Sequence, residues 1–114
     1  MQASLLPALS YIESRHRDKA RGRAGEVSRY QVMPYVWREY KGRNPRDKAE
    51  ADRVALRILT DRTARFTALR KRPPTTAETY LLWARPAWAY RGHWTPVLKE
   101  RANRFAAAVK GHQP

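Results

Sequence analysis

The chain has 114 residues, with 24 lysines and arginines against 10 acidic residues, and it contains no cysteine. This length suits one domain with a single core, and the lack of cysteine excludes disulfides and thiolate metal sites. The 42% of hydrophobic residues is typical of a folded protein, and the formal charge of +14 favours anionic partners such as nucleic acid, lipid or cell-wall polymer.

The first predicted element is a helix over residues 4–17, in which Pro7 fits the first turn. Its apolar residues recur at three- and four-residue spacing: Leu5, Leu6, Leu9 and Ile12. No apolar run approaches the roughly 20 residues that span a bilayer. Because the opening segment has no basic end and runs directly into this helix, we interpret it as folded protein rather than as a signal peptide.

A basic segment with two glycines follows, and its lack of periodicity predicts a loop from Arg15 to Arg29. Pro34 suits the first turn of the next helix, which Gly42 ends. The apolar side of this helix contains Val36, Trp37 and Tyr40. Its aromatic content makes it a candidate wall for a cleft.

The longest predicted helix begins at the segment Asn44-Pro45-Arg46-Asp47, which combines a capping residue, a proline and an acid near the positive end of the helix dipole. Basic residues 70–72 complement its other end, and Pro73-Pro74 stop it. Its apolar positions are Ala51, Val54, Ala55, Ile58, Leu59, Phe66 and Leu69. We expect this helix to form the backbone of the core.

Two shorter helices are predicted after it. Thr75 and Glu78 have the spacing of a capping box and open a helix through Tyr80 to Trp83 that Pro86 ends. Thr95-Pro96 begins the last helix, which carries Leu98, Ala102, Phe105 and Val109 and ends at Gly111. Between these two helices, Trp88, Tyr90 and Trp94 are expected in a loop that they secure by packing. The sequence therefore predicts a mainly α fold in a single domain, residues 1–114, without a clear strand pair.

Residues 13–34 also contain an ordered motif. Glu13-Ser14 is followed in register by Ala20, Gly25, Gln31 and Met33-Pro34. This order resembles the catalytic domain of soluble lytic transglycosylases and goose-type lysozymes, whose pattern is Glu-Ser, an Ala, and then Gly-Ala-x-Gly-Leu-Met-Gln-Leu-Met-Pro. The resemblance implies a lysozyme-like helical domain with a glycine-bearing catalytic loop.

The resemblance further implies an enzyme that breaks the MurNAc-GlcNAc β-1,4 bond of the peptidoglycan glycan strand, without metal or cofactor. Glu13 is then the general acid and base, and the product is a 1,6-anhydro sugar. An acid in apolar surroundings keeps its proton closer to neutral pH, because desolvation disfavours its charge. The implied location is the cell envelope (periplasm), a secreted form or a phage particle. The alternative for Glu13 is a solvated carboxylate paired with Arg15 or Arg17.

Glu26 is a possible second carboxylate, since some goose-type lysozymes carry an acid at a similar place. If its carboxyl group lies about 6.5 to 9.5 Å from that of Glu13, it can hold a water and make the enzyme an inverting hydrolase. The alternative is a loop acid that Arg23 or Arg29 neutralises.

Five further residues are candidates for substrate binding: Ser14, Tyr30, Gln31, Tyr80 and Trp83. In the family, Gln31 lines the cleft and can bond a sugar amide or hydroxyl, although a buried amide that pins the loop is the alternative. The three aromatic side chains can stack on sugars or belong to the core. The histidines, His16, His93 and His112, show no metal-ligand spacing, so no metal is predicted.

Two other classes of function stay open. One is a small helical nucleic-acid-binding module, in which arginines neutralise phosphates through non-specific charge and aromatic rings stack on bases. The other is a wall-binding or secretion-apparatus domain that keeps the fold with reduced catalysis. The second alternative follows from residues 82–86, which correspond only loosely to the family's later Ala-Tyr-Asn-Ala-Gly segment and lack its Asn and Gly.

Overall fold

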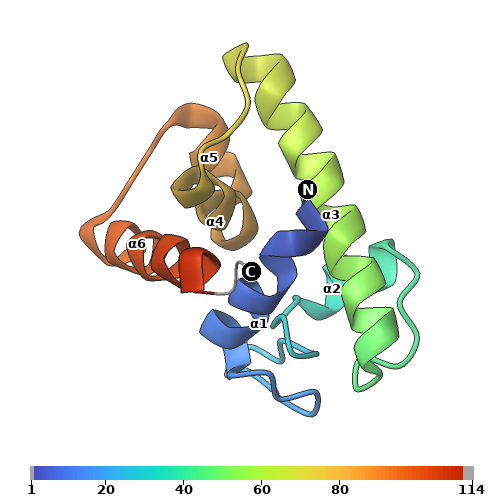
Figure 1. The fold of residues 1–114 in the computed structure, drawn as a ribbon. Coiled ribbons are helices and arrows are strands. Elements are labelled where there is room, and N and C mark those ends of the chain that lie inside the picture. Colours follow the sequence, from blue (N-terminus) through green and yellow to red (C-terminus); the bar gives the residue numbers. More distant parts are fainter. Residues whose placement is uncertain (1, 112–114) are drawn as a thin grey trace. The chain divides into compact units, whose positions relative to one another are not determined.

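The computed structural model describes residues 2–111, and its regular elements are helices (Figure 1). Their order is η1 (Gln2–Leu5), α1 (Leu6–Ser14), α2 (Pro34–Glu39), α3 (Lys48–Arg70), α4 (Thr76–Ala84), α5 (Pro86–Arg91) and α6 (Pro96–Gly111). The predicted mainly α fold class is confirmed. The chain divides into two compact units, residues 1–58 and 59–114, with the boundary inside α3. The single domain stays a prediction.

Helix α3 begins at Lys48, about one turn later than its predicted start. The Asn44 side chain accepts a hydrogen bond from the Arg46 N–H at 3.1 Å and so forms a local turn before the helix. Asp47 caps the helix instead, because its carboxylate accepts the Glu50 N–H at 2.9 Å. The far end agrees with the prediction, although Leu69 is 54% exposed rather than buried.

The core of the second unit lies where α4 packs against α5 and α6 (Figure 1). Its buried cluster consists of Phe66, Leu81, Leu82 and Ala89, with Trp88, Tyr90, Trp94 and Leu98 packed around it. The predicted loop for Trp88 and Tyr90 was wrong, because both lie in α5. Pro86 ends α4 and also begins α5, since a proline fits the first helical turn. On the predicted apolar side of α6, Ala102, Phe105 and Val109 are buried and Leu98 is partly buried.

Gly42 follows α2 and allows a close approach of backbone to ring. A β-carbon at this position would overlap the indole of Trp37, which is buried. The Gly42 N–H also bonds the Trp37 carbonyl at 2.9 Å. Glycine is therefore needed here for space rather than for a left-handed backbone.

The predicted capping box at the start of α4 is confirmed. Thr75 Oγ1 accepts the Glu78 N–H at 3.1 Å, and Glu78 Oε1 accepts the Thr75 N–H at 2.9 Å. Arg72 donates to both carboxylate oxygens of Glu78, at 2.7 and 2.8 Å. The Arg72 bonds, assisted by Thr75, lower the pKa of Glu78 to about 2.

We expect Glu78→Gln to lower the free energy of unfolding by about 1 kcal/mol near neutral pH, because it removes the charge that Arg72 and the helix start bind. The folded pKa lies below the ordinary value of 4.5, so this stabilisation is present above pH 4.5 and is lost as the pH falls toward about 2. Urea unfolding of both proteins across this range measures it. If the difference in unfolding free energy between the two proteins stays constant down to pH 2, the effect comes from the shape of the side chain and not from its charge.

Candidate functional site

Helix α1 ends at Ser14, three residues before its predicted end. Arg15 and His16 have left-handed backbones, with φ of 55° and 66°, and the Arg15 N–H returns to the Tyr11 carbonyl at 2.9 Å. A non-glycine residue rarely takes this conformation, so the helix stops sharply. Glu13 and Ser14 consequently lie in the last turn of α1, directly before the loop of residues 15–33.

Ser14 holds the end of α1 to this loop. Its side chain is buried, and its hydroxyl donates to the Arg29 carbonyl at 2.7 Å and accepts the Arg17 N–H at 3.0 Å. A buried hydroxyl that already makes two bonds has little left for a ligand. We therefore assign Ser14 to positioning the site, in place of the predicted contact with substrate.

The 15–33 loop folds as a small meander around Val27. Isolated antiparallel bridges join Val27 to Arg21 on one side and to Val32 on the other, and Val27 and Val32 exchange both backbone bonds at 2.8 Å. The turn between them includes Ser28 and Gln31, which have positive φ values of 71° and 55°. This backbone places the side chains of Gln31 and Glu26 on the same part of the loop.

Glu26 and Gln31 meet over Gly22. A β-carbon on Gly22 would lie less than 3.0 Å from both Glu26 Oε1 and Gln31 Oε1, so these two oxygens are less than about 6 Å apart. Glu26 Oε1 accepts the Ala24 N–H at 2.8 Å, and the Gln31 amide donates to the Ser28 carbonyl at 3.0 Å. The two half-buried side chains thus present acceptor oxygens that suit hydroxyl or amide donors.

The ion-pair alternative drawn from the sequence does not hold for Glu26, and for Glu13 it stays a prediction. Glu13 is half-buried, while Arg15 lies over the Tyr11 ring and the Arg17 Nε bonds the Ser14 carbonyl at 2.9 Å. Arg29 pairs with Asp18 at 2.7 Å and not with Glu26. Within residues 2–111, Glu26 forms no ion pair with an arginine.

Tyr30 is a core residue and not an open stacking surface. Its side chain is 1% exposed, and its hydroxyl donates to Asp52 on α3, which also pairs with Lys48 at 2.7 Å. Burial, together with the bond to Asp52, raises the pKa of Tyr30. The tyrosine therefore stays protonated and fastens the 15–33 loop to α3. Sequence reasoning missed Asp52, because the two residues are 22 positions apart.

Tyr80 and Trp83 belong to the other unit, and both are buried there. Tyr80 is 1% exposed, and its ring centroid lies 5.7 Å from that of Phe105. Trp83 is 9% exposed, with the Arg62 guanidinium over its ring at 5.9 Å. Neither ring offers a broad open face to a sugar, so we leave both out of the candidate site.

The structure describes two of the three histidines. His16 Nδ1 lies 3.0 Å from Ser10 Oγ, and His93 packs edge-on against Trp88. His112 lies outside the described residues. In the described part of the chain, no three His, Asp or Glu side chains are grouped to hold a metal ion.

The structure thus brings Glu26 and Gln31 together over Gly22, and the Ser14 bond links their loop to the helix end that bears Glu13. The chain matches no protein-family model, no characterised protein and no solved structure. Among residues 2–111, every helix is too short or too polar to span a bilayer.

Proposed function

We propose that the protein is a peptidoglycan-cleaving glycosidase of the lytic transglycosylase type, with Glu13 as general acid and base. One observation carries the proposal. The buried Ser14 hydroxyl bonds the Arg29 carbonyl at 2.7 Å and so joins the helix end that bears Glu13 to the loop that bears Gln31. Proton transfer to a bound sugar depends on such fixed placement, and a rigid support supplies it.

The proposed reaction uses one carboxyl group twice. Glu13 donates its proton to the bridging oxygen as the bond from that oxygen to the sugar C1 breaks. The 6-hydroxyl of the same sugar then attacks C1, and the Glu13 carboxylate takes the hydroxyl proton. The glutamate regains its proton, a 1,6-anhydro sugar forms, and no water is consumed.

Glu26 decides between this reaction and hydrolysis. Its oxygen and that of Gln31 lie close together over Gly22 and suit a sugar hydroxyl, a sugar amide or a water molecule. A water held and activated by Glu26 would attack C1 and give the hydrolysed product. Because Gln31 also braces the loop through Ser28, we assign it to holding substrate and to shaping the loop.

The test is digestion of purified peptidoglycan by the whole protein. We expect loss of turbidity and release of muropeptides that are one water lighter than hydrolysed products, as mass spectrometry measures them. Hydrolysed products that disappear in Glu26→Gln would instead identify an inverting hydrolase. Failure to release any muropeptide at low and moderate salt would overturn the proposal.

A second candidate, a basic module that binds nucleic acid, is favoured by the surface of residues 59–111. This unit has eleven lysines and arginines against three acids. The exposed Arg65 and Arg85 lie over the rings of Tyr90 and Trp88, at 5.2 and 5.4 Å. Within the described residues neither arginine forms an ion pair. An arginine that stacks on an aromatic ring and forms no ion pair has a fixed position and an unneutralised charge. Such a side chain is suited to binding a phosphate group.

A gel-shift titration with single-stranded DNA separates this candidate from the first. Nucleic-acid binding predicts a salt-dependent shift that Arg65→Ala with Arg85→Ala weakens more than a matched loss of two charges at Arg104 and Lys110, both exposed on α6. Equal weakening of binding by both double variants would indicate that net charge alone causes the shift. It would exclude Arg65 and Arg85 as a specific nucleic-acid-binding surface.

A further inference from the structure

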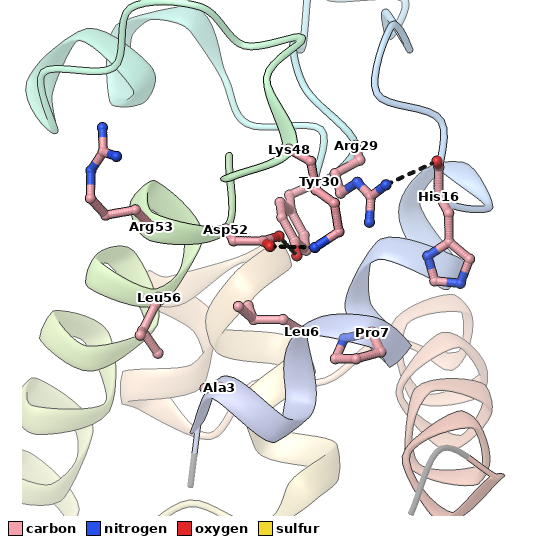
Figure 2. Close-up of a pocket in the computed structure, with 10 residues that line it drawn as sticks. All are labelled: Ala3, Leu6, Pro7, His16, Arg29, Tyr30, Lys48, Asp52, Arg53 and Leu56. Carbon is pink, nitrogen blue, oxygen red and sulfur yellow. Dashed lines mark hydrogen bonds and ion pairs between the residues drawn. The ribbon is translucent and has the colours of Figure 1, made fainter. Parts of the chain in front are cut away.

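A cavity of about 630 Å³ lies in the first unit, apart from Glu26 and Gln31 (Figure 2). It is bounded by α1, by the 15–33 loop and by the first turns of α3. Its apolar wall includes Leu6 and Pro7 from α1 and Leu56 from α3. This volume falls within the range of about 300 to 1,000 Å³ that small-molecule sites occupy, and such sites are mainly apolar with a few convergent polar groups.

The polar part of this α1–α3 cavity is built around Asp52. Figure 2 shows the Tyr30 hydroxyl and the Lys48 ammonium meeting at this carboxylate. Tyr30 donates to one oxygen of Asp52 and Lys48 donates to the other, so both carboxylate oxygens already have a partner among the lining residues. Asp52 therefore has little capacity left to bind a cation.

Positive groups outnumber negative ones among the residues that line the cavity. Arg29, Lys48 and Arg53 line it together with the imidazole of His16, whereas Asp52 is the one carboxylate in the lining. The other two acids that pair with these cations, Asp18 and Glu50, are not part of the lining. An anionic group inside the cavity consequently meets three cations, each of which also contacts one carboxylate.

Two of these cations can turn toward a ligand at low cost. The side chains of Lys48 and Arg53 are 60% and 56% exposed, and their ion pairs lie along the surface of α3 at spacings of four and three residues. Exposed pairs of this kind contribute little free energy, so a second acceptor can share or replace them. Arg29, only 11% exposed and bonded to Asp18, forms a more rigid part of the rim.

We propose that the α1–α3 cavity binds a small organic acid, whose apolar body lies against Leu6, Pro7 and Leu56 and whose carboxylate meets Lys48 and Arg53. The carboxylate can come from a free acid or from the C-terminus of a peptide, and both present the same head group. A cation would find Asp52, the one carboxylate in the lining, already engaged by Tyr30 and Lys48, and a neutral molecule of the same shape would leave the charged rim unused. This proposal does not rest on the glycosidase assignment.

The test is a titration of the whole ¹⁵N-labelled protein with octanoate, followed by amide chemical shifts. We expect changes confined to residues 6–7, 29–30 and 48–56, with octylamine and octanol binding at least fivefold more weakly. A parallel titration with N-acetyl-leucine, which presents a peptide-type carboxylate, distinguishes the two sources. If only one of the acids gives these changes, that source is assigned.

Lys48→Ala should weaken octanoate binding at least fivefold, because it removes a cation and leaves Asp52 to repel the ligand. Arg57→Ala is the matched control: it removes one exposed cation from the same helix outside the lining. The proposal is overturned if the control weakens binding as much as Lys48→Ala, if octylamine binds equally well, or if neither acid shifts these amides.

Discussion

Glu13→Gln is expected to reduce muropeptide release about 10²- to 10⁴-fold, which is the usual contribution of a positioned general acid and base. Glutamine has nearly the same size and keeps a hydrogen-bonding end, but it can neither donate the first proton nor accept the second. Because the side chain is half-buried in the last turn of α1, an isosteric change should leave the helix intact. The initial rate of turbidity loss at fixed protein concentration measures the effect.

Glu39→Gln provides the matched control. Glu39 is the last residue of α2, is exposed, and loses the same charge on substitution. It should keep the rate of the unmodified protein to within about twofold, with the helical circular dichroism of all three proteins equal. Retention of activity in Glu13→Gln, or an equal loss in both variants, would exclude Glu13 as the acid.

Local signals in the sequence predicted most of the helices. Thr75 and Glu78 are three residues apart, and their reciprocal bonds form within one turn, so sequence spacing is enough to locate the start of α4. Proline also acts locally, and it marks the first turns of α2 and α6. Helix α5 was missed because Pro86 was interpreted only as the end of α4, although it also occupies the first turn of α5.

Tertiary contacts explain the features that sequence could not predict. Nothing in the local sequence predicts the left-handed backbone of Arg15, and the bond from Ser14 to the Arg29 carbonyl joins the end of α1 to a segment that lies 15 residues later. The pair of Lys48 and Asp52 could be inferred from its four-residue spacing, whereas the Tyr30 hydroxyl that joins it comes from a distant loop. Sequence therefore locates Glu13 on a helix end but does not separate site residues from their supports.

Tyr30→Ala is expected to lower the free energy of unfolding by about 3 to 5 kcal/mol, the usual cost of removing a buried aromatic ring. Tyr30 is 1% exposed and is among the largest fully buried side chains in the structure. Urea denaturation measures the change. Tyr35→Ala is the matched control, since Tyr35 is 59% exposed on α2 and should change stability by less than about 0.5 kcal/mol.

Tyr30→Phe separates the hydroxyl from the ring. It should cost about 1 to 3 kcal/mol, because the half-buried carboxylate of Asp52 loses its donor while Lys48 remains. Burial raises the pKa of Tyr30 above the 10.0 of an ordinary tyrosine, so its contribution is complete below pH 10 and is lost as the pH rises beyond that value. The unmodified protein should therefore lose its advantage over Tyr30→Phe in strong alkali. Were Tyr30 instead an open stacking face for sugars, both of its variants would unfold at the same urea concentration as Tyr35→Ala and would lose only activity.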